Sequence, residues 1–62
     1  MKTFKGYVVQ YAYEADYKVH VVRYEHEAQA KLKLVQYPFE ADIKVVFVQY
    51  PFEADLIVCM EY

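Results

Sequence analysis

The 62-residue sequence contains no serine, asparagine or tryptophan, and only one cysteine, one glycine and one threonine. Without serine and asparagine, neither a serine-based catalytic triad nor its asparagine-assisted variants can be assembled. The lone Cys59 excludes an internal disulfide, and the lone Gly6 excludes a glycine-rich loop that would cradle phosphate. We therefore expect a protein that is not an enzyme, in which Cys59 is a reduced and buried thiol.

Long hydrophobic runs and strong charge are also absent. No apolar stretch approaches the length of about 20 residues that spans a bilayer. The stretch after Met1 is interrupted at Gln10 and is too short for a secretory signal. The net charge of −2 gives no general attraction to nucleic acid or anionic lipid. We expect a cytoplasmic protein that does not contact membranes and for which nucleic acid is a disfavoured partner.

The sequence does contain a 13-residue repeat. Residues 35–42 recur without change at 48–55, and stepping back by the same 13 residues finds two weaker copies. Every copy has valine at its first position, with tyrosine, glutamate and alanine at fixed positions after it. We divide a single domain, residues 1–62, into a half unit 1–8 and units 9–21, 22–34, 35–47 and 48–62. The near-identity of the last two units is typical of a recent duplication or of a designed consensus.

Each unit contains one stretch with the alternating pattern of a β-strand. Because side chains alternate across a strand, residues of one parity share a face. The apolar parity is the predicted core face, and its members are Tyr17, Val19, Val21, Ala30, Leu32, Leu34, Ile43, Val45 and Phe47. The other parity begins with lysine in four of five copies, such as Lys44, and ends in valine and tyrosine. We expect this second face to be half-buried.

The segments between strands predict wide corners. Two-residue hairpins favour Asn-Gly or Asp-Gly because their central residues need positive φ, and neither dipeptide occurs. Pro38 and Pro51 fit the second position of a type I turn, followed by one right-handed helical turn with every φ negative. Such a corner can close a hairpin or carry the chain to another sheet. In the second corner, Glu27 and Lys31 are spaced i, i+4, so a short helix over 25–31 is an alternative.

The corner and the strand after it resemble the septoil-knot domain proteins, small bacterial proteins with tandem units of Ser-x-Ala-Asp, a Lys-Val-aromatic strand and a tyrosine. Residues 14–19, Glu-Ala-Asp-Tyr-Lys-Val, and 40–45, Glu-Ala-Asp-Ile-Lys-Val, match that rhythm. The aspartate becomes Gln29 in one copy. The serine position holds a ring in every copy, namely Tyr13, His26, Phe39 and Phe52. The resemblance implies an all-β fold whose strands wind around one another as a torus knot, and it implies no established activity.

We therefore predict an all-β domain of five strands and four corners, wound as a torus knot or closed by a homo-oligomer. A chain of this length buries only about 60% of its unfolded surface, so a lone core is marginal. The two histidines and Cys59, each in a different unit, are a poor zinc set, and we expect no metal or cofactor. Association with another copy is the remaining way to add burial, so we expect a homo-oligomer.

The corners supply the candidate functional residues. Their glutamates and aspartates could bind calcium or act as acid–base pairs, but the pair recurs at most corners and so belongs to the repeat. The candidate interaction surface is the tyrosine column with its neighbouring arginine: Tyr11, Tyr24, Tyr37, Tyr50 and Arg23. We expect a non-enzymatic module that binds a protein partner or copies of itself. The alternative is a nucleotide or single-stranded RNA binder whose tyrosines stack on bases.

Overall fold

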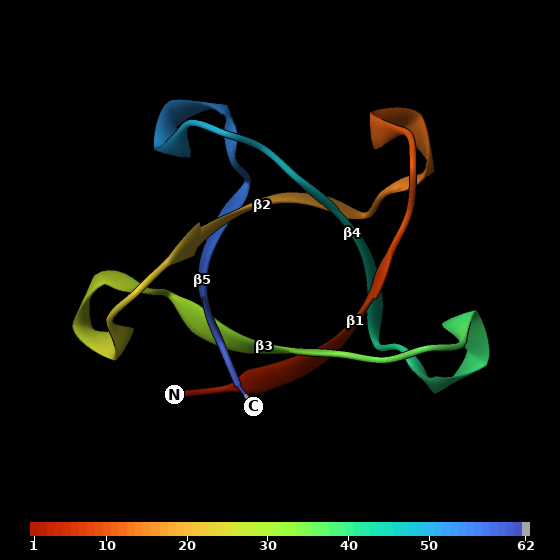
Figure 1. Cartoon of the computed structure of the whole chain (residues 1–62), viewed down its shortest axis with the longest axis horizontal. Coiled ribbons are helices and arrows are strands. Elements are labelled where there is room, and N and C mark those ends of the chain that lie inside the picture. The colour runs from red at the N-terminus through yellow and green to blue at the C-terminus, as the bar shows by residue number, and fades with distance from the viewer. Residues whose placement is uncertain (62) are drawn as a thin grey trace.

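The computed structural model describes residues 1–61, which form five strands and four single turns of 3₁₀-helix (Figure 1). The strands are β1 (Thr3–Val8), β2 (Tyr17–Val22), β3 (Ala30–Leu34), β4 (Ile43–Phe47) and β5 (Leu56–Met60). One turn stands at each corner: η1 (Ala12–Glu14), η2 (Glu25–Glu27), η3 (Pro38–Glu40) and η4 (Pro51–Glu53). The prediction of an all-β fold with five strands is confirmed.

Each corner consists of a 3₁₀ turn between two extended residues. At the third corner Tyr37 has φ −124° and ψ 140°, Pro38 opens the turn, and Ala41 follows it with φ −89° and ψ 146°. The Ala41 amide donates to the Pro38 carbonyl at 3.1 Å, which closes the turn. Among residues 1–61 none has positive φ, as predicted. The corners therefore do not need glycine or asparagine, the residues that best tolerate positive φ.

The second corner has the same form as the others, so the alternative of a short helix over 25–31 is wrong. The 3₁₀ turn ends at Glu27 and β3 begins at Ala30. The Lys31 ammonium approaches Glu25, with 3.4 Å between Nζ and Oε1. Because Lys31 lies in a strand, Glu27 and Lys31 are not on successive turns of one helix, and the sequence spacing between them does not indicate a contact.

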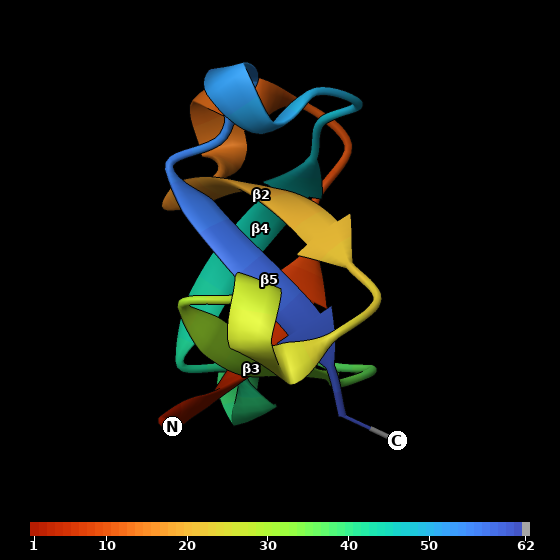
Figure 2. The same cartoon turned by 90° about the vertical axis from the view of Figure 1, so that its left-hand side faces the viewer.

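All strand pairs are parallel, and the sheet closes into a barrel in the order β1-β3-β5-β2-β4. Consecutive strands are never neighbours. Each corner carries the chain past one intervening strand and contacts it: η1 passes β4, η2 passes β5, η3 passes β1 and η4 passes β2. Figures 1 and 2 show a chain that winds around a central axis while the four corners project outward. The corners therefore join parallel strands and do not close hairpins.

A constant stagger closes the barrel. Strands two repeats apart pair residues 28 positions apart, as in Thr3 with Lys31. Strands three repeats apart pair residues 37 positions apart, as in Gly6 with Ile43. The separation of 28 is two residues more than two 13-residue repeats, and the separation of 37 is two residues fewer than three repeats. Each strand is therefore shifted by two residues against the next, in the same direction all the way around the barrel. Stagger and strand tilt are linked in a barrel, so the strands run obliquely to its axis, as Figure 2 shows.

One residue from each strand builds the centre of the core. These five residues occupy one column of the repeat and are all buried: Gly6, Val19, Leu32, Val45 and Val58. Four half-buried side chains pack against this ring: Phe4, Ile43, Leu56 and Met60. Leu32 occupies the space beside Gly6, because a Cβ on Gly6 would lie 2.6 Å from Cδ1 of Leu32. The prediction that Val45 is a core residue is confirmed.

The predicted core face is buried only in part. The prediction that Phe47 is a core residue is wrong, since Phe47 is 41% exposed. Three other members of the predicted face are also exposed: Val21 at 40%, Leu34 at 42% and Tyr17 at 43%. Short strands that run obliquely through a narrow barrel place their middle residue at the centre of the interior, and the next residue of the same parity towards the C-terminus reaches the rim. Ala30, at the start of β3, is a further member of the predicted face that is buried. Lys44 is exposed, as predicted.

The barrel closes within one chain. β1 lies between β3 and β4, and β5 lies between β2 and β3, so both terminal strands have a partner on each side. Of the two predicted ways to close the sheet, winding the chain on itself is therefore the one observed. No strand of the described barrel offers an open edge that a second copy would have to cover.

Candidate interaction surface at the corners

A polar residue after each 3₁₀ turn anchors the corner to the strand that it passes. The Asp42 amide donates to the Lys5 carbonyl at 2.8 Å, and Oδ2 of Asp42 accepts from the Lys5 amide at 3.0 Å. The same two hydrogen bonds join Asp16 to Lys44, Asp55 to Lys18 and Gln29 to Ile57. These side chains bond to backbone amides, so the aspartate column serves the fold. Gln29 departs from the repeat in sequence but keeps the bond, with Oε1 at 3.0 Å from the Ile57 amide.

Each corner tyrosine stacks on the ring two residues after it. Tyr37 and Phe39 have ring centroids 5.6 Å apart and planes inclined by 17°. The other three pairs have the same geometry: Tyr11 with Tyr13, Tyr24 with His26 and Tyr50 with Phe52. In the three pairs whose outer ring is tyrosine or phenylalanine, that ring is the more exposed, at 83% for Phe39 against 53% for Tyr37. The predicted interaction surface included the tyrosines but not the outer rings, although these rings also recur in one column of the repeat.

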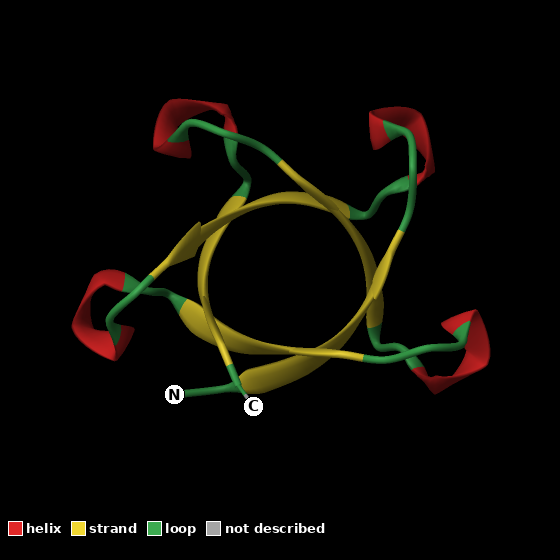
Figure 3. Ribbon diagram, viewed as in Figure 1, coloured by secondary structure: helices red, strands yellow, loops and turns green. Residues whose placement is uncertain are grey.

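The four tyrosines do not form one surface. Tyr11, Tyr24, Tyr37 and Tyr50 lie at four separate corners around the barrel, where Figure 3 shows the turns. Arg23 precedes Tyr24 and lines a small cleft with Cys59 and the last residues of β2. The predicted candidate surface is therefore divided into four small surfaces, each containing one stacked ring pair.

The corners are acidic as well as aromatic. Eight of the nine acidic residues lie there: Glu14, Asp16, Glu25, Glu27, Glu40, Asp42, Glu53 and Asp55. Within residues 1–61, no three histidine, cysteine or acidic side chains gather closely enough to hold a metal ion. The corners thus present carboxylates singly or in pairs beside exposed rings.

Cys59 and His20 do not form a dyad. Cys59 is a buried free thiol whose Sγ lies 3.7 Å from the Arg23 carbonyl. His20 has Nδ1 3.4 Å from the carbonyl of Val48. Although β2 and β5 are neighbours, their register places His20 opposite Ile57 and not opposite Cys59. Cys59 is therefore a packed small side chain, as the sequence indicates for a lone cysteine in an apolar strand.

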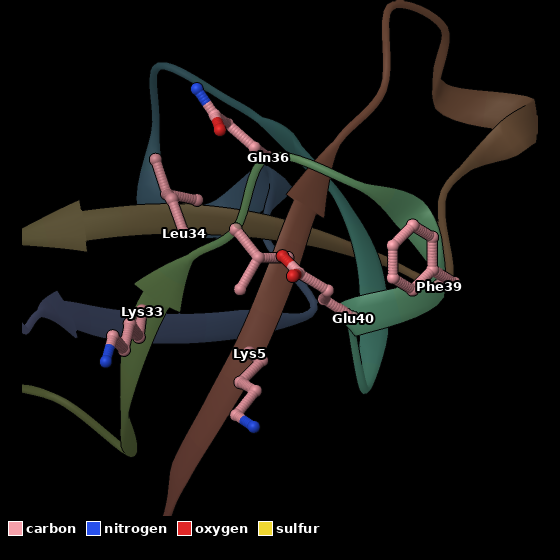
Figure 4. A pocket seen from close by; sticks show the side chains of 7 residues that line it. Lys5, Lys33, Leu34, Gln36, Phe39 and Glu40 are labelled. Atoms are coloured by element: carbon pink, nitrogen blue, oxygen red, sulfur yellow. The ribbon is translucent and has the colours of Figure 1, made fainter.

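A cleft of about 660 Å³ lies between β1, β3 and η3, as Figure 4 shows. Its lining residues are Lys5, Lys33, Leu34, Val35, Gln36, Phe39 and Glu40. The register brings Lys5 of β1 directly opposite Lys33 of β3. Local sequence patterns could not reveal this pairing, because the two lysines are 28 residues apart and belong to strands that do not follow each other in the chain.

None of the helical turns in residues 1–61 is long enough or apolar enough to cross a membrane.

Comparison with known protein families agrees with the fold. Searches of curated proteins and of solved structures find no match. The family model of the 7(1) septoil knot domain matches residues 2–62, which is nearly the whole chain. The chain therefore belongs to the septoil knot domain family.

Proposed function

We propose that the chain is a non-catalytic interaction module that binds a protein partner, and copies of itself, through its aromatic corners. The observation that carries this proposal is the exposure of the outer rings, which reaches 83% for Tyr13, Phe39 and Phe52. A small chain with a narrow core leaves these large rings unburied. Aromatic rings dominate the binding energy of protein interfaces. Rings already stacked in pairs lose little side-chain freedom on binding.

The charge of the corners favours a protein partner over a nucleic acid. Each corner places two carboxyl groups within a few residues of its ring pair, as Glu40 and Asp42 do beside Phe39. Carboxylates repel phosphates, whereas lysine and arginine are attracted both to carboxylates and to the faces of aromatic rings. A partner with basic side chains therefore fits these surfaces best.

Two further observations support a non-catalytic protein, and a third supports a cytoplasmic one. The corner aspartates accept hydrogen bonds from backbone amides, as Asp42 does from Lys5, which ties these carboxylates to the fold. The corner glutamates recur once in each unit, so no single position is distinguished as a reaction centre. A cytoplasmic location is part of the same proposal, since a chain with the single Cys59 forms no internal disulfide and needs no oxidising compartment to fold.

The ring column provides the test. The triple variant Tyr13→Ser, Phe39→Ser and Phe52→Ser introduces the residue that the family pattern carries at this position, so we expect it to fold. Immobilised wild-type and variant chains would be exposed to lysate of the native host, and captured proteins quantified by mass spectrometry. We expect the variant to lose the partner, while Val21→Ser, which removes apolar surface at the rim, retains it. Equal capture by wild type and the triple variant would contradict the proposal. Oligonucleotide binding that the same substitutions abolish would favour base stacking instead.

A further inference from the structure

One position of the barrel pairs two lysines. Lys5 on β1 and Lys33 on β3 are register partners, and neighbouring strands lie about 4.8 Å apart. Like charges directly opposite each other in a sheet are destabilising. Among the described residues, the ion pair found on these strands joins Lys31 to Glu25 and involves neither Lys5 nor Lys33. The pair therefore concentrates positive charge on one side of the cleft without a carboxylate bound to it.

The repeat shows that this pairing is a local departure. Four equivalent register pairs occur around the barrel, and each contains at most one lysine: Lys18 with Val46, Lys31 with Cys59, Tyr7 with Lys44 and His20 with Ile57. The column of Lys33 otherwise holds residues that are half-buried or buried, whereas Lys33 is exposed. The fold thus does not require a lysine here, and a valine serves in the equivalent place on β4.

The lining of the cleft is ordered along its length. Figure 4 shows Lys5 and Lys33 towards one end, the exposed ring of Phe39 at the other, and the Glu40 carboxylate between them. Two ammonium groups suit a phosphate dianion, which a single lysine would neutralise only in part. A carboxylate is a common partner of sugar hydroxyls in nucleotide sites. An exposed phenyl ring offers a stacking face for a base.

We propose that this cleft binds a small phosphate ester whose phosphate and flat ring are joined by a hydroxyl-bearing linker, as in a nucleoside monophosphate. The phosphate lies between Lys5 and Lys33, the hydroxyls contact Glu40, and the ring stacks on Phe39. The volume of about 660 Å³ is within the range of small-molecule sites, roughly 300 to 1,000 Å³. This site shares Phe39 and Glu40 with the proposed protein contacts, but it differs from them in depending on the lysine pair, which the other corners lack.

Nuclear magnetic resonance of the ¹⁵N-labelled chain tests the proposal, with AMP, adenosine and inorganic phosphate as separate probes. We expect AMP to shift the amides of Lys5, Lys33 and Phe39 and to bind at least about tenfold more tightly than adenosine or phosphate. Added salt should weaken the binding of AMP more than that of adenosine, because only AMP engages the lysines by charge. Shifts of equal size at all four corners would overturn the assignment of one site.

Two substitutions taken from the repeat sharpen the test. Lys33→Val copies Val46, the equivalent residue on β4, and should weaken AMP binding at least about tenfold. Lys44→Val removes the same charge outside the cleft and should leave AMP binding unchanged. If Lys33→Val binds AMP as tightly as the wild type does, the lysine pair is not the recognition element and the proposal is wrong.

The reverse substitution should create a second site. Residues 48–55 repeat residues 35–42 without change, so the corner beside Val46 already carries Phe52 and Glu53. Val46→Lys would place a lysine opposite Lys18, which is the register partner of residue 46. We expect this variant to bind two molecules of AMP, with new shifts at Lys18 and Phe52. A folded variant that still binds one molecule at the original cleft would overturn the proposal.

Discussion

At the scale of single residues, the five-residue ring at the centre of the core contains one very small residue, Gly6, and one large residue beside it, Leu32. Gly6 supplies no side chain, and Leu32 extends into the space that a Cβ on residue 6 would occupy. Valine fills the equivalent place at Val19, Val45 and Val58. Since interiors are close-packed, the sizes at positions 6 and 32 depend on each other. Position 6 therefore requires glycine because there is no space for a Cβ. The backbone conformation does not require it, since φ of Gly6 is not positive.

The dependence of these two residues is measurable. We expect Gly6→Ala to lower the free energy of unfolding by about 1–3 kcal/mol, because the added methyl group collides with Leu32. The double variant Gly6→Ala with Leu32→Val should unfold at a higher urea concentration than the sum of the two single effects indicates. Strict additivity in this double-mutant cycle would show that the two side chains do not compete for the same space.

The difference between the middle and the rim of a strand gives a second prediction. Val45→Ala removes two buried methyl groups and should cost about 1.5–3 kcal/mol of unfolding free energy, including the cavity that it leaves. Phe47→Ser removes a side chain that is 41% exposed and should cost less, about 1 kcal/mol or below. Urea titration followed by circular dichroism would measure both values. A larger cost for Phe47→Ser would mean that its ring is buried in solution.

At the scale of one element, the corner is a 3₁₀ turn held by a side chain that completes a β-ladder. The Asp42 carboxylate accepts a hydrogen bond from the Lys5 amide, and the Asp42 amide donates one to the Lys5 carbonyl. The bonded strand is the one that the corner passes, so the anchor fixes where the chain crosses. This gives the two acidic columns different roles, since Glu40 makes no comparable bond to β1 among the hydrogen bonds of the described residues.

Substitutions in one corner separate these roles. Asp42→Ala leaves the Lys5 amide without its acceptor and should cost about 0.5–1.5 kcal/mol, with faster hydrogen exchange of that amide. Asp42→Asn keeps an oxygen acceptor and should behave nearly as the wild type does, as Gln29 already shows that an amide serves. Glu40→Gln should change unfolding by about 0.5 kcal/mol or less. If Glu40→Gln were the more costly change, the glutamate would have to carry a structural role.

At the scale of the whole molecule, local patterns predicted the elements but not their arrangement. The 13-residue repeat, the alternation around Val45 and the absence of Asn-Gly turns indicated five strands and corners with negative φ. A corner without positive φ is compatible with a hairpin and with a crossover, so strand order was undetermined. Order and register depend on contacts between residues 28 or 37 positions apart, and these contacts leave no local signature. The exposure of Phe47 follows from the tilt of the strands, which is also a property of the closed barrel.

The same division applies to the candidate site. The column that contains Tyr37 was visible because it recurs in every unit, and its exposure is about half in the structure. The stacking of Tyr37 on Phe39 depends on the corner geometry, in which Tyr37 is the extended residue before the 3₁₀ turn and Phe39 is the middle residue of the turn. The cleft with Lys5 and Lys33 could not be predicted, because only the register brings those lysines together. Repeat columns predict what all units share, and a site at one position needs the topology.

The closed barrel changes the reasons for expecting an oligomer. Unpaired strand edges give no reason for association, since every strand has two partners. What remains is exposed apolar surface in a small protein: the outer corner rings are 83% exposed in three units, and rim residues such as Phe47 and Leu34 are more than 40% exposed. Exposed aromatic rings are the side chains that contribute most to protein interfaces, and here each corner presents them as a pair. Self-association would therefore proceed through the aromatic side chains of the corners, and would leave the strand pairing unchanged.

Light scattering after gel filtration, over a range of micromolar concentrations, would measure this association directly. We expect a mass above the 7.4 kDa of one chain, rising with concentration because each corner buries little area by itself. The double variant Phe39→Ser with Phe52→Ser should lower the mass without changing the β-sheet signal in circular dichroism, since both phenyl groups are exposed and lie outside the core. Lys44→Ala, an exposed change outside the corners, is the matched control and should keep the wild-type mass. A mass that stays at 7.4 kDa over the whole range would show that the wound barrel is stable alone, and that the exposed rings await a different partner.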